Sequence, residues 1–236
     1  MNGFPEYYDV EVWGIPLRLY DPESVTIPII LKDFEKDEQG CKNLPFTPKV
    51  ILDVGAHVGL FSILMAKKYP DCEVIAVEAI KENYDSLKKN IEINHCDIIP
   101  LIGCVGKENG ETVLFRHPVN SGSVSLFNEE GWKEHKVKTT SLDSIVREIG
   151  EIDLLKMDIE GGEYLTLKSF TEWERVKNMT VEIHSIPGLS DEENKSLARN
   201  FISFLKKNMG EKHLSYCSYA ANEWMVWGEK RETEWK

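Results

Sequence analysis

The chain has 236 residues and a formal net charge of −12. This length fits one domain with an appendage and can bury a large core. The acidic balance gives no basic footprint, which argues against a nucleic-acid partner. Five cysteines without C-x-x-C spacing argue against a zinc site or a disulfide framework and favour a reducing compartment; they are Cys41, Cys72, Cys96, Cys104 and Cys217.

The sequence predicts neither a signal peptide nor a membrane span. The first ten residues lack the basic start and apolar core of a signal peptide. The longest apolar stretch, Val50 to Ala66, is interrupted by Asp53, His57 and two glycines, so it does not predict a membrane span. We therefore expect a cytoplasmic protein without a membrane partner.

The first 48 residues differ in pattern from the rest. Residues Val10 to Tyr20 alternate around Trp13-Gly14-Ile15-Pro16, which predicts a small β-hairpin. Residues Asp21 to Pro48 are irregular, and the charged stretch Lys32 to Lys42 predicts a short helix or a lid. We expect residues 1–48 to form an N-terminal hairpin with a candidate lid, and residues 49–236 to form the main domain.

From Lys49 onward, strands and helices alternate, which is typical of a parallel sheet. The pattern predicts an α/β fold with a seven-stranded, mostly parallel sheet and an antiparallel C-terminal hairpin. The seven strands of this sheet are predicted at Val50–Asp53, Glu73–Glu78, Ile98–Val105, Leu154–Asp158, Thr180–His184, His213–Tyr219 and Glu223–Gly228, and two further strands at Thr112–Arg116 and Lys136–Thr140. Helices are predicted at Gly59–Lys68, Lys81–Asn94 and Ser141–Ile149, after Gly161–Gly162, and at Ser190–Asn208, which starts with a capping box.

The first predicted strand leads into a glycine turn with an acid at its mouth. Gly55 and Gly59 bracket the turn, and a helix that begins there presents N–H groups at the ligand-binding edge of the sheet. A dinucleotide site would need a third glycine at His57, and Asp53 would repel a pyrophosphate. The carboxylate suits an amino group and a sulfonium, which S-adenosylmethionine has. An ordinary strand–turn–helix corner is the alternative interpretation.

Other residues extend this predicted cofactor site. Glu78 ends the second strand about twenty residues past the turn, where an acid accepts hydrogen bonds from ribose hydroxyls. A solvated carboxylate at a strand end is the alternative. We expect the glycine turn to hold the methionine end and residues 104–106 to line the adenine. The predicted cofactor-binding residues are Asp53, Gly55, Ala56, His57, Gly59, Glu78, Ala79, Cys104, Val105 and Asp158.

A second group of charged residues is predicted beside the cofactor site, on the side where a methyl acceptor would bind. Asp158 and Glu160 follow the fourth strand, and His184 ends the fifth. Parallel strand ends meet at one edge, so these three are the catalytic candidates, with His184 as general base. Glu163 also suits a helix N-terminus. Asp158, Glu182 and His184 could instead bind Mg²⁺, an alternative that ranks lower because histidine is a poor partner for a hard ion.

These segments resemble the FkbM-type S-adenosylmethionine-dependent methyltransferases. The resemblance covers roughly residues 49 to 185 and is carried by Asp53-Val-Gly55-Ala-His57-Val-Gly59-Leu-Phe-Ser62, by Glu78 before Glu82-Asn83-Tyr84 and Leu87-Lys-Lys-Asn90, by Ser141-Leu142-Asp143, and by Lys156-Met-Asp158-Ile-Glu160-Gly161-Gly-Glu163. It implies a Rossmann-like class I methyltransferase fold and S-adenosylmethionine as donor. His57 and Ala79 depart from the family's usual Asn and Pro.

The resemblance implies methylation of a hydroxyl on a sugar, a polyketide or another small molecule. No Asp/Asn-Pro-Pro-aromatic tetrad occurs, so the motif of amino-methylating enzymes is absent. We therefore expect an O-methyltransferase with a hydroxylated small-molecule acceptor. A nicotinamide-dependent oxidoreductase and a non-catalytic nucleoside-binding module are the alternatives.

Overall fold

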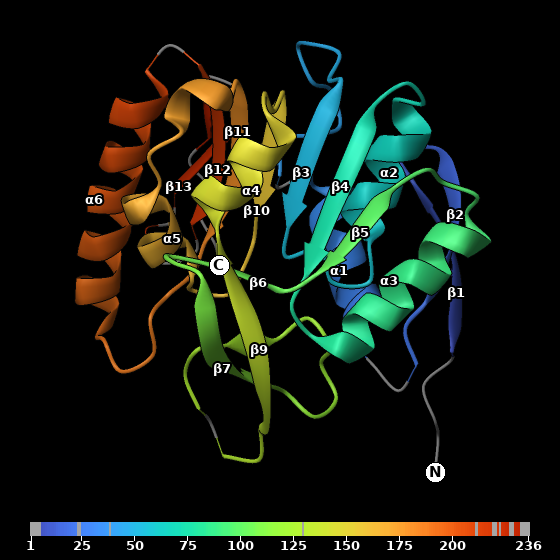
Figure 1. Ribbon diagram of the computed structural model, residues 1–236, viewed down its shortest axis with the longest axis horizontal. Coiled ribbons are helices and arrows are strands. Elements are labelled where there is room, and N and C mark those ends of the chain that lie inside the picture. The colour runs from blue at the N-terminus through green and yellow to red at the C-terminus, as the bar shows by residue number, and fades with distance from the viewer. Residues whose placement is uncertain are drawn as a thin grey trace.

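The computed structural model describes residues 6–22, 25–37, 39–128, 130–210, 212–218, 221, 223–226 and 229–231. A mostly parallel sheet runs through the centre with helices on both of its faces (Figure 1). The carboxyl ends of β3 (Val50–Val54) and β4 (Glu73–Glu78) point to the lower side in Figure 1. A second, smaller sheet extends below them.

The central sheet has eight strands in the order β14-β13-β12-β11-β10-β3-β4-β5. The remaining parallel strands are β5 (Ile99–Ile102), β10 (Leu154–Met157), β11 (Asn178–Ile183) and β12 (His213–Ser218). The predicted α/β class is confirmed, but the strand count of seven is wrong. The C-terminal hairpin of β12 and β13 (Glu223–Val226) continues into a further antiparallel strand, β14 (Glu229–Arg231). The predicted strand ends at 219 and at 227–228 lie outside the described residues.

The predicted strand Ile98–Val105 is two strands in the structure. β4 ends at Glu78, so the chain beyond Ile102 has no partner in the central sheet. It leaves at Gly103, and β6 (Cys104–Gly106) pairs with β9 (Lys133–Ser141) instead. The second sheet has the order β6-β9-β7-β8, with β7 at Gly110–Arg116 and β8 at Val124–Ser125.

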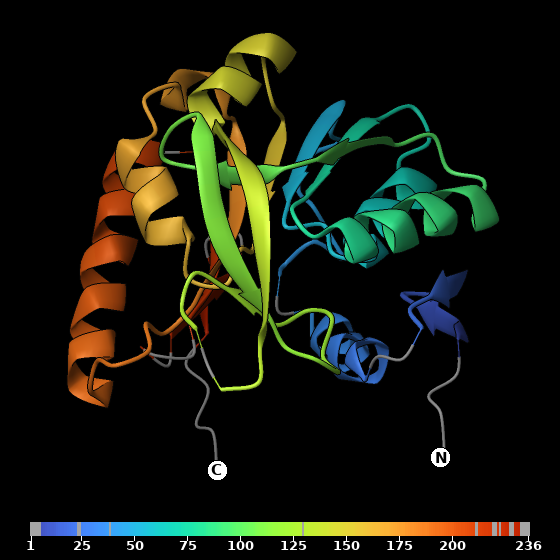
Figure 2. The same cartoon turned by 60° about the horizontal axis from the view of Figure 1, so that its bottom comes forward.

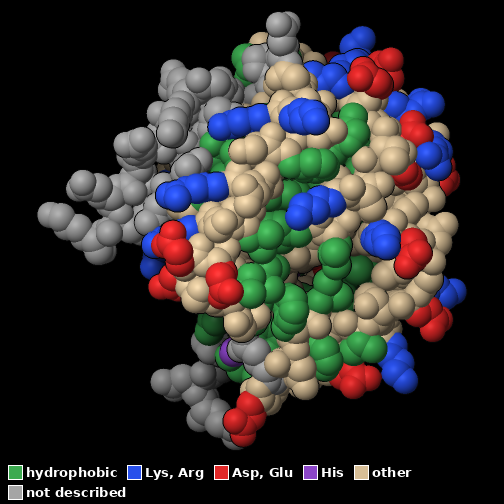
Figure 3. Space-filling view, turned by 90° about the vertical axis from the view of Figure 1, so that its left-hand side faces the viewer, with side chains coloured by type: hydrophobic (Ala, Val, Ile, Leu, Met, Phe, Trp, Pro, Cys, Tyr) green, Lys and Arg blue, Asp and Glu red, His purple; other side chains and the backbone are tan. Residues whose placement is uncertain are grey.

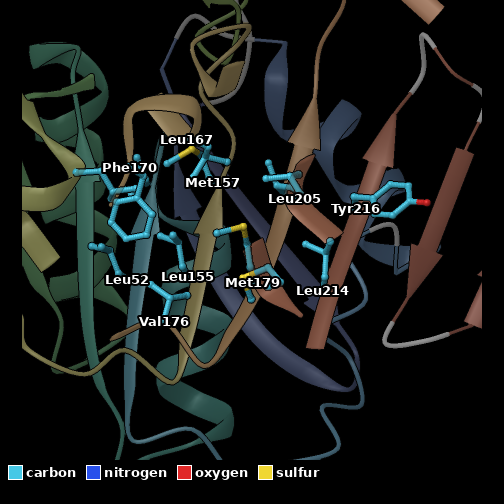
Figure 4. Close-up of a cluster of buried hydrophobic side chains, with 14 of the residues drawn as sticks. Leu52, Leu155, Met157, Leu167, Phe170, Val176, Met179, Leu205, Leu214 and Tyr216 are labelled. Atoms are coloured by element: carbon cyan, nitrogen blue, oxygen red, sulfur yellow. The ribbon is translucent and has the colours of Figure 1, made fainter. Parts of the chain in front are cut away.

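One face of the central sheet packs on α4 (Leu142–Ile149), α5 (Glu163–Ser169) and α6 (Asp191–Met209), and the short 3₁₀ helix η1 (Trp173–Arg175) adjoins it. Figure 4 shows side chains such as Leu155, Met157 and Met179 gathered in this core. The predicted capping box opens α6, where Ser190 Oγ accepts a hydrogen bond from the Glu193 N–H. On the side that carries α6, acidic and basic side chains lie interspersed with hydrophobic ones (Figure 3).

The other face packs on α2 (Leu60–Lys68), α3 (Lys81–Ile93) and the N-terminal segment. The hairpin of β1 (Tyr7–Val12) and β2 (Ile15–Tyr20) starts three residues earlier than predicted. Asn90 on α3 fixes β2, because its side chain bonds both the N–H and the C=O of Tyr20, at 2.6 and 3.0 Å. The division at residue 48 stays a prediction.

The irregular segment after the hairpin contains a helix, α1 (Thr26–Glu35), which begins before the charged stretch that predicted one. Ile27 and Phe34 of α1 join the same buried cluster as Ile51 of the central sheet and Phe61 of α2. Figure 2 shows α1 beside the loop that joins β7 to β9. Across the part of the chain that the structure describes, no helix has the length and apolar character to cross a membrane.

Candidate active site

A cavity of about 530 Å³ lies at the carboxyl ends of β3, β4, β10 and β11, with α1 and the β7–β9 loop contributing further walls. Most residues that the sequence predicted for the site border it. They are Gly55, Ala56, His57, Glu78, Ala79, Cys104, Val105, Asp158 and Glu160. Asp53, Gly59 and His184 do not border the cavity but lie behind its walls.

The two glycines of the turn are required by different neighbours. Gly55 has φ +83°, and a Cβ there would lie 1.7 Å from the backbone oxygen of Asp158. The turn therefore sits directly against the end of β10, where only glycine fits. Gly59 has φ +93°, and a Cβ there would lie 2.5 Å from Leu87 Cδ1 of α3. Gly59 thus serves helix packing and does not border the cavity.

Asp53 is fully buried and reaches the cavity only through Lys156. Its carboxylate accepts a hydrogen bond from Ser62 Oγ at 2.6 Å and lies 3.3 Å from Lys156 Nζ. The same ammonium donates to the Gly55 carbonyl at 2.9 Å and lies 3.4 Å from Asp158 Oδ2. Burial opposes the charge of Lys156, but the Asp53 and Asp158 carboxylates outweigh it and raise its pKa. Asp53 does not border the cavity, and its direct contact with a cofactor stays a prediction.

Glu78 is a buried carboxylate held by backbone donors. Its two oxygens accept hydrogen bonds from the N–H groups of His57 at 2.9 Å and Ile80 at 2.8 Å. Burial raises its pKa, and these hydrogen bonds work against the rise. Asn83 Nδ2 also donates to Oε1, at 3.5 Å, so Oε2 is the oxygen that keeps capacity for a further hydrogen bond, and Glu78 borders the cavity. A ribose with two neighbouring hydroxyls fits this carboxylate, and Cys104 and Val105 continue the wall where a base would lie.

A polar network that the sequence did not reveal closes one side of the cavity. Ser121 Oγ, in the β7–β9 loop, lies 2.6 Å from His57 Nε2, 3.0 Å from Asp21 Oδ2 and 3.1 Å from Thr26 Oγ1. Burial first, and then nearby Arg116, lower the pKa of His57 to about 3, so its imidazole is neutral. The network joins the glycine turn, the loop and the start of α1 around one hydroxyl.

The second predicted group of charged residues brings one imidazole among four carboxylates. His184 Nδ1 lies 3.0 Å from Glu163 Oε1, and Glu163 is fully buried and accepts the N–H groups of Ile159 and Gly161. His184 Nε2 faces the other three acids at 3.5 to 3.8 Å; these are Glu160, Asp158 and Glu182. The structure thus brings together the three catalytic candidates and adds Glu163, whose burial the sequence did not indicate.

The crowding of charges shifts the pKa values of this cluster in different directions. Burial, with Asp158 next, raises the pKa of Glu182 to about 8. Burial, followed by the Asp158 and Glu163 carboxylates, raises that of Glu160 to about 7 against the attraction of His184. Burial opposes the charge of His184, but Glu163 and Glu160 raise its pKa well above the usual value. At Asp158, Lys156 outweighs burial and lowers the pKa.

The same cluster contains a set of atoms that could hold a metal ion. One ligand atom each from Asp158, Glu182 and His184 lie within 4.8 Å of one another. Glu163 would orient the imidazole through the other ring nitrogen, as carboxylates that hydrogen-bond metal-bound histidines do. Two carboxylates and one imidazole suit a divalent transition metal better than Mg²⁺.

Comparison with known proteins links the chain to one protein family. The model of the methyltransferase FkbM domain matches residues 53–212. The chain is 30% identical over 210 residues to methyltransferase sdnD of Sordaria araneosa, covering 73% of this chain and 81% of that protein. It is 23% identical to methyltransferase 1 of Beauveria bassiana, over 56% of this chain and 64% of that protein. The structure of methyltransferase FkbM from Methylobacillus flagellatus KT aligns with a TM-score of 0.39 at 18% identity, over 64% of this chain and 34% of that one.

Proposed function

Because the chain belongs to the FkbM methyltransferase family, we propose that it transfers a methyl group to a hydroxyl of a small molecule. Membership in this family confirms the predicted S-adenosylmethionine cofactor and sets aside the nicotinamide-dependent oxidoreductase. The observation that carries the proposal is the set of three carboxylates on one cavity wall, Asp158, Glu160 and Glu182. Such a wall can accept the proton that a hydroxyl must lose when its oxygen is methylated.

Glu78 is the residue that we assign to the ribose, because its carboxylate is fixed by two backbone N–H groups and still has free acceptor capacity. The Gly55–His57 turn would hold the methionine end, with Lys156 tying that turn to Asp158. Cys104 and Val105 would border the adenine. When bound, the cofactor supplies a methyl carbon that is already electrophilic, so the protein has mainly to align the acceptor and take up its proton.

Glu160 is our candidate for the general base, in place of His184. Its pKa of about 7 matches a base that works near neutral pH, and its side chain borders the cavity. His184 stands behind the wall and is held by Glu163, so it would position Glu160 and tune its pKa. Glu182 has a similarly raised pKa and borders the cavity as well, so it is the second candidate.

The grouping of Asp158, Glu182 and His184 favours a metal-assisted route as the alternative mechanism. A divalent cation held by Asp158, Glu182 and His184 would lower the pKa of an acceptor hydroxyl beside it. In that case chelation should abolish methyl transfer and leave cofactor binding intact.

The proposal is tested first by ligand-dependent stability. Saturating S-adenosylhomocysteine should add about 2.7 kcal/mol to the free energy of unfolding at a hundredfold excess over Kd, whereas NAD should add nothing. Transfer of a labelled methyl group to one of a set of hydroxylated metabolites would then distinguish an enzyme from a non-catalytic nucleoside-binding module. A protein that is stabilised by NAD and not by S-adenosylhomocysteine would refute the proposal.

A further inference from the structure

Part of the cavity extends beneath α1, away from Glu78 and Cys104. Lys156 on β10 pairs with Thr180 on β11, and Glu182 pairs with Cys217 on β12, so these side chains share one face of the sheet. This face is the one that α1 and the segment after it cover, because Thr180 Oγ1 donates to the Gln39 carbonyl at 2.8 Å. We call this part of the cavity the acceptor lobe; it is bordered by Ile30, Phe34, Gln39, Phe61, Thr180 and Glu182.

The acceptor lobe has an apolar wall on two sides. Ile30 and Phe34 lie four residues apart on α1 and therefore on the same face of that helix. Phe61 of α2 borders the cavity near the sheet, with its ring 5.9 Å from Lys156 Nζ. The position of α1 is fixed by the Trp13 indole, which donates to the Phe34 carbonyl at 2.9 Å. A hydrated or strongly polar ligand would gain little against these side chains.

One polar group in the acceptor lobe lacks a partner. Gln39 Oε1 is buried and accepts no hydrogen bond from any described residue. The backbone of Gln39 is held by Thr180 Oγ1, which keeps this residue at the border of the acceptor lobe. A buried acceptor of this kind is rare in native proteins unless a ligand or a water donates to it.

The charge of the lobe is negative toward the sheet edge. Asp158, Glu160 and Glu182 border the same cavity, whereas Lys156 is already shared between Asp53 and Asp158. A phosphate or carboxylate on the acceptor would be repelled by these acids and would find no free cation among the described residues of the lobe.

We infer that the acceptor is an uncharged alcohol on an apolar skeleton, with a second hydrogen-bond donor. The skeleton packs on Ile30, Phe34 and Phe61, the reacting hydroxyl lies beside Glu160 and Glu182, and the second donor bonds Gln39 Oε1. This inference rests on the proposed methyl transfer and narrows its acceptor class. It excludes sugar phosphates, and it excludes free sugars as preferred acceptors.

The experiment uses the full chain saturated with S-adenosylhomocysteine and three probes observed by saturation-transfer NMR. Phenylethylene glycol carries an apolar ring and two hydroxyls, glucose is uncharged but fully hydrated, and glucose phosphate is anionic. We expect phenylethylene glycol to bind at least about tenfold more tightly than either sugar. Equal or tighter binding of glucose or glucose phosphate, or no binding of the diol, would overturn the inference.

Two variants test whether the diol binds in the acceptor lobe. Gln39→Leu removes the amide acceptor at similar volume and should weaken diol binding about fivefold, the effect of one hydrogen bond. Ile30→Ala should weaken it by a similar factor, whereas the control Leu189→Ala removes an exposed apolar side chain outside the cavity and should change nothing. Unchanged diol binding in both Gln39→Leu and Ile30→Ala would contradict the inference.

The affinity for S-adenosylhomocysteine is measured first for each protein, which separates the two hypotheses. If the wild type fails to bind S-adenosylhomocysteine, the proposed function fails. If it binds S-adenosylhomocysteine and the diol result is negative, only the acceptor class is wrong.

Discussion

The carboxylates at the two ends of the cavity are stabilised in different ways. At one end Glu78 accepts hydrogen bonds from neutral donors, which are the backbone N–H groups of His57 and Ile80 and the Asn83 side chain. At the other end, Asp158, Glu160, Glu163 and Glu182 surround His184, and their charges shift one another's pKa values. The first arrangement suits fixed recognition of a ligand, and the second suits proton transfer. This difference can be tested at both ends.

The largest effect is expected from Glu160→Gln. Loss of a general base should slow methyl transfer by roughly 10²–10⁴ while leaving the affinity for S-adenosylhomocysteine nearly unchanged. The rate is measured with labelled donor and a responsive acceptor. Glu108→Gln is the matched control, because Glu108 borders another part of the cavity. A Glu160→Gln enzyme with wild-type rate would assign the base to Glu182, to His184 or to a metal-bound route.

The pH dependence of the rate distinguishes Glu160 from His184. In the wild type, the rate should rise with pH through about 7, the pKa of Glu160. Because His184 lowers this pKa, His184→Gln should move the rise to higher pH. If His184 is itself the base, the rise should disappear in that variant.

The next largest effect is expected on stability, from Lys156→Met. Removing the ammonium leaves the fully buried Asp53 without its cation, which should lower the free energy of unfolding by about 3–5 kcal/mol. Urea unfolding measures the loss, and Lys168→Met on the exposed side of α5 is the control. Adding Asp53→Asn to Lys156→Met should recover part of the stability. A Lys156→Met protein as stable as the wild type would mean that the buried ion pair contributes nothing net.

A smaller effect is expected at the cofactor end, from Glu78→Ala. Loss of hydrogen bonds from a charged acceptor should weaken S-adenosylhomocysteine binding by about 1.5–3 kcal/mol, as measured by calorimetry. Glu73→Ala is the control, since it removes an exposed acid from the start of the same strand. Wild-type affinity in a folded Glu78→Ala protein would show that this acid does not meet the cofactor.

The sequence predicted the Glu78 end better than the His184 end. The apolar run of β3, the glycine turn and the acid after the next strand are local features whose spacing sets their places in the sheet. At the other end, the tight grouping depends on register and burial. Asp53 lies opposite Lys156 across two strands that are about a hundred residues apart in the chain. No periodicity in the sequence indicates the pairing of Asp53 with Lys156. The sequence analysis therefore predicted that Asp53 contacts the ligand.

Long-range contacts explain the other differences. Ser121 lies 64 residues from His57 and 100 from Asp21, and only the folded chain brings them together. The position of α1 could not be predicted for a related reason. The sequence indicated a short helix or a lid nearby, but only the folded chain shows that Ile30 and Phe34 border the cavity. Gly103 marks a break in the predicted strand, yet the reason for the break is that β4 ends beside it.

The last expected effect is the pH dependence of stability at the acceptor end. Glu182 has an ordinary pKa of 4.5 that rises to about 8 in the fold, so between these values the folded chain binds more protons than the unfolded one. The free energy of unfolding should therefore fall as pH rises from about 5 to 8. For a chain of this size each kcal/mol corresponds to about 2–4 °C in Tm. In Glu182→Gln the free energy of unfolding should depend less on pH over this range.

Divalent cations provide a further test of this prediction. A metal held by Asp158, Glu182 and His184 would favour the ionised carboxylates, so Mn²⁺ at pH 8 should restore the lost stability and EDTA should remove the gain. Thermal unfolding with and without Mn²⁺, in the wild type and in Glu182→Gln, measures both effects. If Mn²⁺ leaves the Tm of the wild type unchanged, the charges are balanced by protons alone, and the base at Glu160 acts without a metal. A flat pH profile in the wild type would instead mean that Glu182 is ionised throughout, and that it rather than Glu160 is free to take the proton.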